Sequence, residues 1–197
     1  MDGRLDGPTP ASSADEVPEA DPVSVARSIV LRRLTAAPRT RAQLADDLRR
    51  RAVPDDVAEQ VLDRFTEVGL IDDQAFASAW VRSRHASRGL SRRALARELR
   101  QKGVDDELAA AALDSLDEDD ERAAAQALVA KRLAALRGHD AQVQIRRLVA
   151  MLARKGYSGA VAMQVVRTAV AEQAASGSAA DVEPDFSPGL SRSLTDL

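Results

Sequence analysis

The apolar residues of this chain follow one pattern that occurs three times. Each copy has two leucines four residues apart, then a turn position, then a second apolar stretch with helical spacing. The first copy contains Thr40, Leu44, Leu48, Ala52, Val53, Val57, Val61, Leu62 and Phe65. The second contains Ser91, Leu95, Leu99, Gly103, Val104, Leu108, Ala112, Leu113 and Leu116, and the third contains Gln144, Leu148, Leu152, Gly156, Tyr157, Val161, Val165, Val166 and Ala169. Repeats of roughly 50 residues are typical of stacked supersecondary units, so the pattern favours an extended binding surface over a catalytic pocket.

Short turns divide each copy into helices. We predict helices over about 23–36, 41–51 and 55–68 in the first copy and over about 73–87, 92–102 and 105–116 in the second. The third copy begins near Glu118 and turns at 137–139 and again at Gly156. Thr40 and Ser91 are predicted N-caps, and Gly69 is predicted to end a helix in the left-handed conformation. Each copy is therefore expected to contain three helices, with a tight turn between the second and the third.

This pattern predicts an all-α protein in which three tandem three-helix repeats form an elongated, curved body. The expected repeats cover residues 23–71, 72–117 and 118–173. Residues 1–22 and 174–197 are rich in Pro, Ser, Gly and acidic residues. We expect these two tails to be disordered, because they have too little apolar surface to offset the entropy cost of ordering.

Composition narrows the function classes. The chain has 45% apolar residues but only 3% aromatic residues, so Leu, Val and Ala must fill the core. Cysteine is absent, which excludes disulfides, thiolate catalysis and cysteine-based zinc sites. The N-terminus lacks the apolar stretch of a signal peptide, and we expect a soluble, cytoplasmic monomer.

The net charge of −3 conceals a basic centre. Residues 1–22 carry six acidic residues and one basic residue, and residues 178–197 carry four and one. Residues 23–177 therefore hold 26 basic and 21 acidic residues, a net charge of +5. The charges therefore predict a basic body between two acidic tails.

The densest basic stretch covers residues 82–102. It contains Arg82, Arg84, Arg88, Arg92, Arg93, Arg97, Arg100 and Lys102 against one acid, Glu98. On a helix, Arg93, Arg97 and Arg100 lie opposite Leu95 and Leu99, so the cations are predicted to face outward. Such a face can bind nucleic-acid phosphates or an acidic protein surface, although many charged faces serve only solvation.

The adjoining stretch is acidic, and this leaves another alternative open. Residues 105–121 hold nine acidic residues and no basic residue. They can neutralise the basic stretch by contacts within the chain, or bind a basic partner in a general helical adaptor. Tandem helix–turn–helix units also resemble DNA-binding elements, although packed helix pairs are common scaffolding.

No set of residues supports an enzyme. The pairs Asp72-Asp73 and Asp105-Asp106 lie at predicted helix starts, where capping is the simpler interpretation. His85 and His139 lie in no metal-ligand motif. Trp80 has helical spacing from Phe76 and Ala77 and is predicted to anchor the core. No phosphate-binding loop or Ser/His/Asp set is present, and no cofactor is expected.

Three stretches of sequence resemble the bacterial RecX family. They are G-L-I-D-D-Q-A-F-A-S-A-W-V-R-S-R at residues 69–84, L-A-R-E-L-R-Q-K-G-V at 95–104 and L-A-R-K-G-Y at 152–157. The resemblance covers about residues 26–172. Two features depart from the family pattern, namely the acidic tails and Ala52, which stands where the other two repeats have a glycine.

The resemblance implies three tandem three-helix repeats and a regulator of the RecA recombinase. Such proteins bind the RecA–DNA filament and inhibit its ATPase, filament extension and strand exchange; some also bind DNA, and they are not enzymes and need no cofactor. The family pattern places basic residues at Arg82, Arg84, Arg92, Lys102 and Lys155, and to these the resemblance extends only a binding role. The alternative is a helix-turn-helix DNA-binding protein that acts without RecA.

Overall fold

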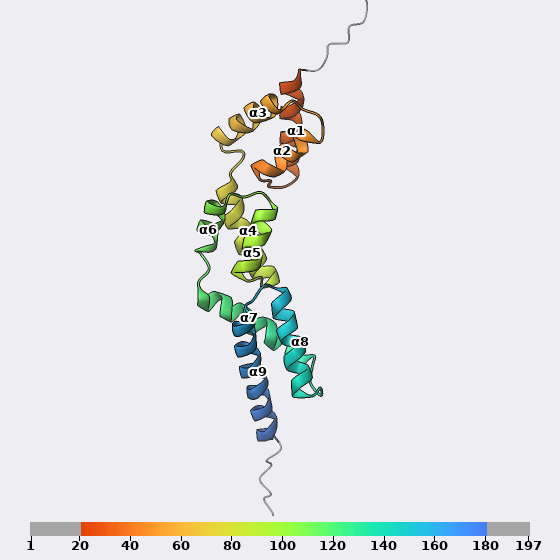
Figure 1. The fold of residues 1–197 in the computed structure, drawn as a ribbon, viewed down its shortest axis with the longest axis vertical. Helices are drawn as coiled ribbons and strands as arrows, with labels where there is room; N and C mark the ends of the chain where they lie inside the picture. Colours follow the sequence, from red (N-terminus) through yellow and green to blue (C-terminus); the bar gives the residue numbers. More distant parts are fainter. Residues whose placement is uncertain (1–20, 181–197) are drawn as a thin grey trace, which may run out of the picture. The chain divides into compact units, whose positions relative to one another are not determined.

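The computed structural model describes residues 21–180, and all regular structure in this range is helical (Figure 1). The helices are α1 (Pro22–Ala36), α2 (Arg41–Arg49), α3 (Asp55–Glu67), α4 (Asp73–Arg88), α5 (Arg92–Gln101), α6 (Asp106–Leu113), α7 (Glu118–Ala134), α8 (Ala141–Arg154) and α9 (Gly159–Ala180). The prediction of an all-α fold built from three-helix repeats is therefore confirmed. None of these helices combines the length and the apolar character needed to cross a membrane.

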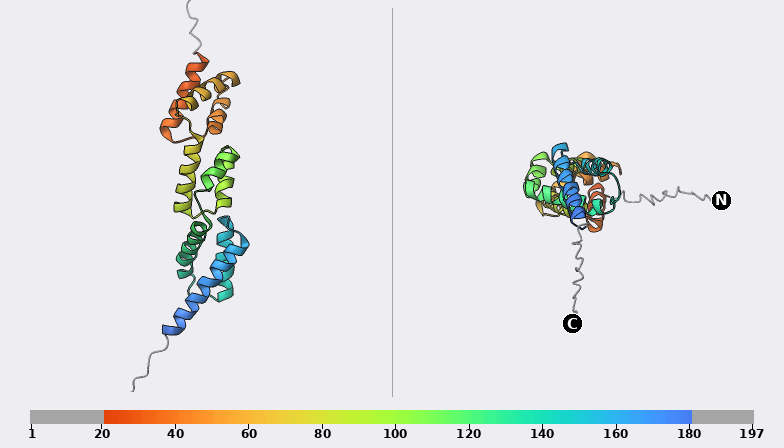
Figure 2. Two further views of the ribbon diagram at one scale, coloured as in Figure 1. Left: turned by 90° about the vertical axis from the view of Figure 1, so that its left-hand side faces the viewer. Right: turned by 90° about the horizontal axis from the view of Figure 1, so that it is seen from below.

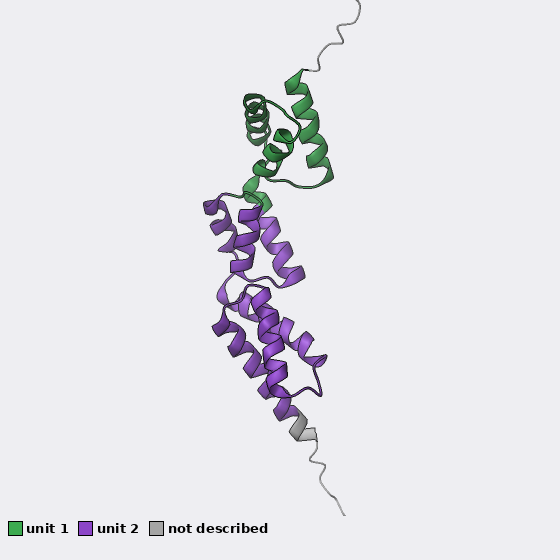
Figure 3. Cartoon of the chain, turned by 45° about the vertical axis from the view of Figure 1, so that its right-hand side comes forward, with its two compact units in different colours: residues 1–76, 102–104 green, residues 77–101, 105–197 purple. Residues whose placement is uncertain are grey.

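The chain divides into two compact units (Figure 3). Of the described residues, unit 1 comprises those up to Phe76 together with Lys102–Val104, and unit 2 comprises Ala77–Gln101 and those from Asp105 onward. Unit 1 thus contains α1, α2 and α3, the start of α4 and the turn that follows α5.

In unit 1, α1, α2 and α3 pack against one another. The helix α2 begins at a capping box, in which the Gln43 N–H donates to Thr40 Oγ1 at 3.2 Å and the Thr40 N–H donates to Gln43 Oε1 at 3.3 Å. The buried core is formed by Ala26, Ile29, Val30, Leu44, Leu48, Val53, Ala58, Val61, Leu62, Phe65 and Ile71. The apolar positions of the first copy therefore face one another, as the spacing predicts.

In unit 2, α7, α8 and α9 form a second three-helix set, and α8 and α9 lie side by side in both views (Figures 1 and 2). Its core consists of Ala125, Val129, Leu133, Leu136, Leu148, Leu152, Tyr157, Ala162, Val165 and Val166. The same unit contains α5 packed on α6, with Leu95 and Leu99 buried.

Most of the two predicted tails lies outside the described residues, but their inner edges are helical. Pro22 is the first residue of α1, and the Asp21 carboxylate caps this helix by accepting from the Val23 and Ser24 N–H groups at 3.3 and 3.1 Å. An aspartate followed by proline is a helix start signal that the predicted tail boundary overlooked. At the other end, α9 continues to Ala180, beyond the predicted start of the tail at residue 174.

Candidate binding surface

The exposed cationic face predicted for α5 is present. Arg93, Arg97 and Arg100 are exposed, whereas Leu95 and Leu99 are fully buried. Arg82 and Arg88 of α4 are exposed as well. Within residues 21–180, the side chains of Arg82, Arg88, Arg93 and Arg97 have no ion-pair partner. These four residues are therefore available to an external anion.

Arg84 serves the packing of α4 on α5. Its guanidinium carbon lies 4.2 Å from the centroid of the Trp80 ring, and its Nε lies 3.5 Å from Glu98 Oε2. The Trp80 indole N–H donates to the same carboxylate oxygen at 2.9 Å. The one acid of the basic stretch thus holds a tryptophan and an arginine together. Trp80 is half-buried between the helices, which corrects the expectation of a core anchor.

Arg92 and Arg100 reach from α5 toward acids of the next helix. Arg92 donates to the Leu116 carbonyl oxygen and lies 3.4 Å from Asp114 Oδ1. Arg100 Nε lies 3.3 Å from Asp106 Oδ1, and both of these side chains are exposed. Contacts between the basic and acidic stretches therefore exist within the chain, but an exposed pair such as Arg100–Asp106 stabilises little and can exchange for an external partner.

Lys155 is engaged in packing within unit 2. Its ammonium group donates to the Arg88 carbonyl oxygen, and its own carbonyl oxygen accepts from the Ser91 N–H at 3.1 Å. The buried Tyr157 hydroxyl donates to the Gly89 carbonyl oxygen at 3.1 Å. The turn after α8 is thus fastened to the turn between α4 and α5.

Lys102 lies in the equivalent turn of unit 1, and its backbone makes a similar contact. Its carbonyl oxygen accepts from Thr40 Oγ1 at 2.6 Å, and its side chain is half-buried. Thr40 and Ser91 are fully buried N-caps at equivalent positions of two repeats. In both cases a Lys-Gly turn packs on the start of an earlier second helix, so this short motif fastens helices together in the fold.

The glycine of each turn is required by close approach as well as by backbone conformation. Gly103 has φ +74° and Gly156 has φ +92°. A Cβ on Gly103 would lie 2.3 Å from the Ala42 Cβ, and a Cβ on Gly156 would lie 2.5 Å from Ser91 Oγ. Ala52, the equivalent residue of the first copy, also has a positive φ of 56°. The turn therefore has the left-handed conformation even without glycine.

One aspartate of each pair caps the helix that follows, as the sequence suggested. Asp72 accepts from the Ala75 N–H at 2.8 Å, and Asp105 accepts from the Glu107 N–H at 2.8 Å. Asp73 instead accepts from the Arg41 backbone N–H at 2.9 Å. Burial raises the pKa of Asp73 above its ordinary value, although that hydrogen bond opposes the shift. No group of three or more His, Asp or Glu side chains suited to a metal ion occurs in the described part of the chain.

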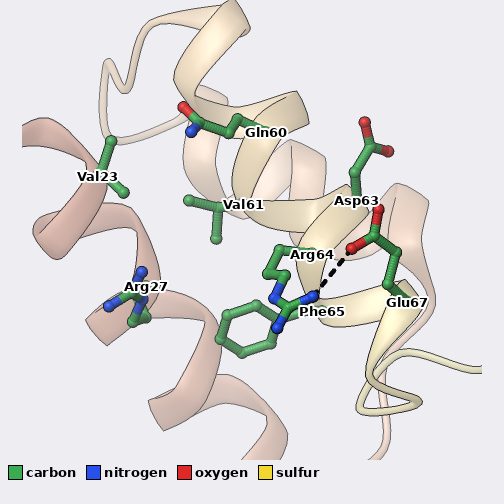
Figure 4. Close-up of a pocket in the computed structure, with 8 residues that line it drawn as sticks. All are labelled: Val23, Arg27, Gln60, Val61, Asp63, Arg64, Phe65 and Glu67. Atoms are coloured by element: carbon green, nitrogen blue, oxygen red, sulfur yellow. Dashed lines mark hydrogen bonds and ion pairs between the residues drawn. The ribbon is translucent and has the colours of Figure 1, made fainter.

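A groove between α1 and α3 offers about 350 Å³ (Figure 4). The buried Val61 and Phe65 contribute its apolar part, and the Arg64 guanidinium is paired with Glu67 at 3.2 Å. It is lined by Val23, Arg27, Gln60, Val61, Asp63, Arg64, Phe65 and Glu67. The lining contains no serine, histidine or lysine.

Comparison with known proteins decides the family. Sequence models of the three RecX domains match in order: the first three-helix domain matches residues 26–65, the second 72–113 and the third 118–166. The chain belongs to the RecX family. Named relatives agree with the assignment. The regulatory protein RecX of Thermobifida fusca is 58% identical over 166 residues, covering 84% of this chain and 87% of that protein. The regulatory protein RecX of Streptomyces coelicolor is 55% identical over 168 residues, covering 85% and 89%. These relatives support a regulatory role.

Solved structures show the same fold. The crystal structure of RecX from Lactobacillus salivarius superposes with a TM-score of 0.68 at 21% identity, covering 76% of this chain and 97% of that chain. A second crystal structure of a regulatory protein RecX gives a TM-score of 0.65 at 25% identity, covering 74% and 72%.

Sequence reasoning missed a second basic region in this RecX chain. Residues 122–171 contain nine basic residues and one acid, Asp140. Those with exposed side chains are Arg122, Lys131, Arg132, Arg137, Arg146, Arg147, Arg154 and Arg167. They are spread over α7, α8, α9 and the turn before α8 rather than gathered in one run, and a charge count over residues 122–171 would have found them.

Proposed function

We propose that this RecX protein binds the RecA–DNA filament and inhibits RecA ATPase activity, filament extension and strand exchange. The ordered match of all three RecX domains carries the proposal. The exposed cations of α5 supply a surface for acidic groups of the filament, because Arg93 and Arg97 have no ion-pair partner within the described residues. The protein acts by binding, and neither catalysis nor a cofactor is part of the proposal.

The alternative is a helix-turn-helix protein that acts on DNA without RecA. In such proteins the N-terminal residues of the recognition helix contact base edges in the major groove. The third helix of the first repeat, α3, starts with Asp55 and Asp56, and that of the second, α6, starts with Asp106 and Glu107. These carboxylates would be repelled by DNA phosphates, so the charges of α3 and α6 argue against this mode.

The test is the DNA-dependent ATPase of RecA, measured with increasing amounts of this protein. We expect inhibition near stoichiometric amounts. In the variant R93A/R97A/R100A, inhibition should need several-fold more protein while the melting temperature changes little, because these side chains face solvent.

As a matched control, R49A/R64A/R132A removes three exposed arginines outside α5. Full ATPase activity in the presence of excess wild-type protein would overturn the proposal. Equal loss of inhibition in the two triple variants would overturn the assignment to α5.

A further inference from the structure

The last repeat has arginines where the earlier repeats receive a turn. Gly103 packs on Ala42, two residues before Leu44, and Gly156 packs on Ala94, one residue before Leu95. The residue directly before the first leucine is Ala94 in the second repeat and Arg147 in the third, and Arg146 precedes it. The small Ala94 leaves room for the turn at Gly156, whereas Arg147 fills the equivalent space of the third repeat and adds charge.

Arg146 and Arg147 belong to a continuous basic surface of α8. Arg154 lies on the same exposed side, since Arg147 and Arg154 are two helical turns apart. The helix contains no acidic residue. Arg147 Nη1 lies 3.1 Å from His139 Nε2, so the turn before α8 contacts the first half of this helix. We define Arg146, Arg147, Arg154 and His139 as the α8 basic surface.

The charges that flank α8 differ from those that flank α5. Nine acidic residues follow α5 within 105–121, and two of them pair with Arg92 and Arg100. Asp140 is the one acid within residues 122–171, and its carboxylate caps α8 by accepting from the Gln142 N–H at 2.8 Å. A partner with mixed charges suits α5, whereas a partner with a continuous row of negative charges meets less repulsion at α8.

We propose that the α8 basic surface binds the phosphate backbone of DNA. This inference deepens the proposed function. It rests on that function in one respect: the DNA that α8 contacts in the cell is taken to be the strand within the RecA filament. Three arginines on one helix face can each contact a phosphate, and the exposed Ala150 and Ala153 between them leave the backbone room to approach. The contact is independent of base sequence, because arginines held against phosphates carry no base readout.

The test measures fluorescence anisotropy of labelled oligo(dT) and of a labelled duplex over a series of salt concentrations, with RecA absent. The wild-type chain should bind at low salt, and R146A/R147A/R154A should bind on the order of tenfold more weakly. Its salt slope should be smaller by about 2 to 3, since each lost phosphate contact lowers the slope by about 1. R146K/R147K/R154K should retain most of the binding because it keeps the charges.

The matched control is R27A/R32A/R64A, which removes the same charge from exposed positions of the first repeat. It should bind DNA nearly as well as wild type. Equal weakening in both alanine variants, or a wild-type chain that does not bind DNA, overturns this inference. RecA is absent from the assay, so that result leaves ATPase inhibition untouched. Conversely, DNA binding through α8 with no inhibition of RecA would overturn the proposed function alone.

Discussion

Asp47 is a buried carboxylate of the first repeat that is surrounded by arginines. It is 4% exposed, and its carboxylate accepts from Arg33 Nη2 at 3.1 Å and from Arg50. Burial alone would raise the pKa of Asp47, but the hydrogen bond from Arg50 and the charges of Arg33, Arg50 and Arg51 outweigh it. The pKa is therefore held below the ordinary value of 3.8.

We predict that D47N lowers the free energy of unfolding by about 2–3 kcal/mol, because it leaves the half-buried Arg33 guanidinium without its anion. D46N, which breaks only the exposed pair with Arg49, should cost less than about 1 kcal/mol. The folded pKa of Asp47 is depressed, so its contribution is present above pH 3.8 and is lost as the pH falls below it. Urea unfolding at a series of pH values checks this, and an equal cost for the two variants contradicts it.

At the scale of the elements, local periodicity predicted most of the helices, but it did not predict which segments pack against each helix. The outward face of α5 follows from the spacing of Leu95 and Leu99 alone. The roles of Arg92 and Lys155 do not, because Arg92 binds a carbonyl group 24 residues away and Lys155 one 67 residues away. A charged residue on a predicted surface can thus be part of the packing, and only the three-dimensional structure separates the two roles.

The fastening of the turn after α8 gives a prediction for Tyr157. Burial raises its pKa to about 12, and the charge of Glu121 adds to the shift. The contribution of the protonated Tyr157 hydroxyl group to folding stability is therefore fully present below pH 10 and is lost as the pH rises toward 12. Because Tyr157 is the one tyrosine of the chain, tyrosinate absorbance reports its ionisation directly.

Y157F should lower the free energy of unfolding by about 1–2 kcal/mol at neutral pH, because the Gly89 carbonyl group loses its donor. Its stability should also fall less than that of wild type between pH 10 and 12. Tyrosinate absorbance that appears near pH 10 in the folded wild-type protein would contradict the burial of this hydroxyl group.

At the scale of the whole molecule, exchanging glycine and alanine should change stability in opposite directions in the first and the third of the equivalent turns. G156A should lower the free energy of unfolding by about 2–4 kcal/mol, because its Cβ would overlap Ser91 Oγ and the Ala94 Cβ in a left-handed conformation. A52G removes the strain of an alanine in the left-handed conformation, but it also raises the conformational entropy of the unfolded chain. The free energy of unfolding should therefore stay the same or rise by up to about 1 kcal/mol. Thermal unfolding of both variants checks the contrast, and destabilisation by A52G would show that its turn is also closely packed.

These end positions have a consequence for assembly. Head-to-tail contacts between identical chains build rings or open filaments, unless the two surfaces that would meet are incompatible. The first turn has Ala52 in place of glycine, and the second helix of the third repeat has Arg146 and Arg147 directly before Leu148. We therefore expect these substitutions to disfavour a head-to-tail contact between two chains that copies the contact between repeats.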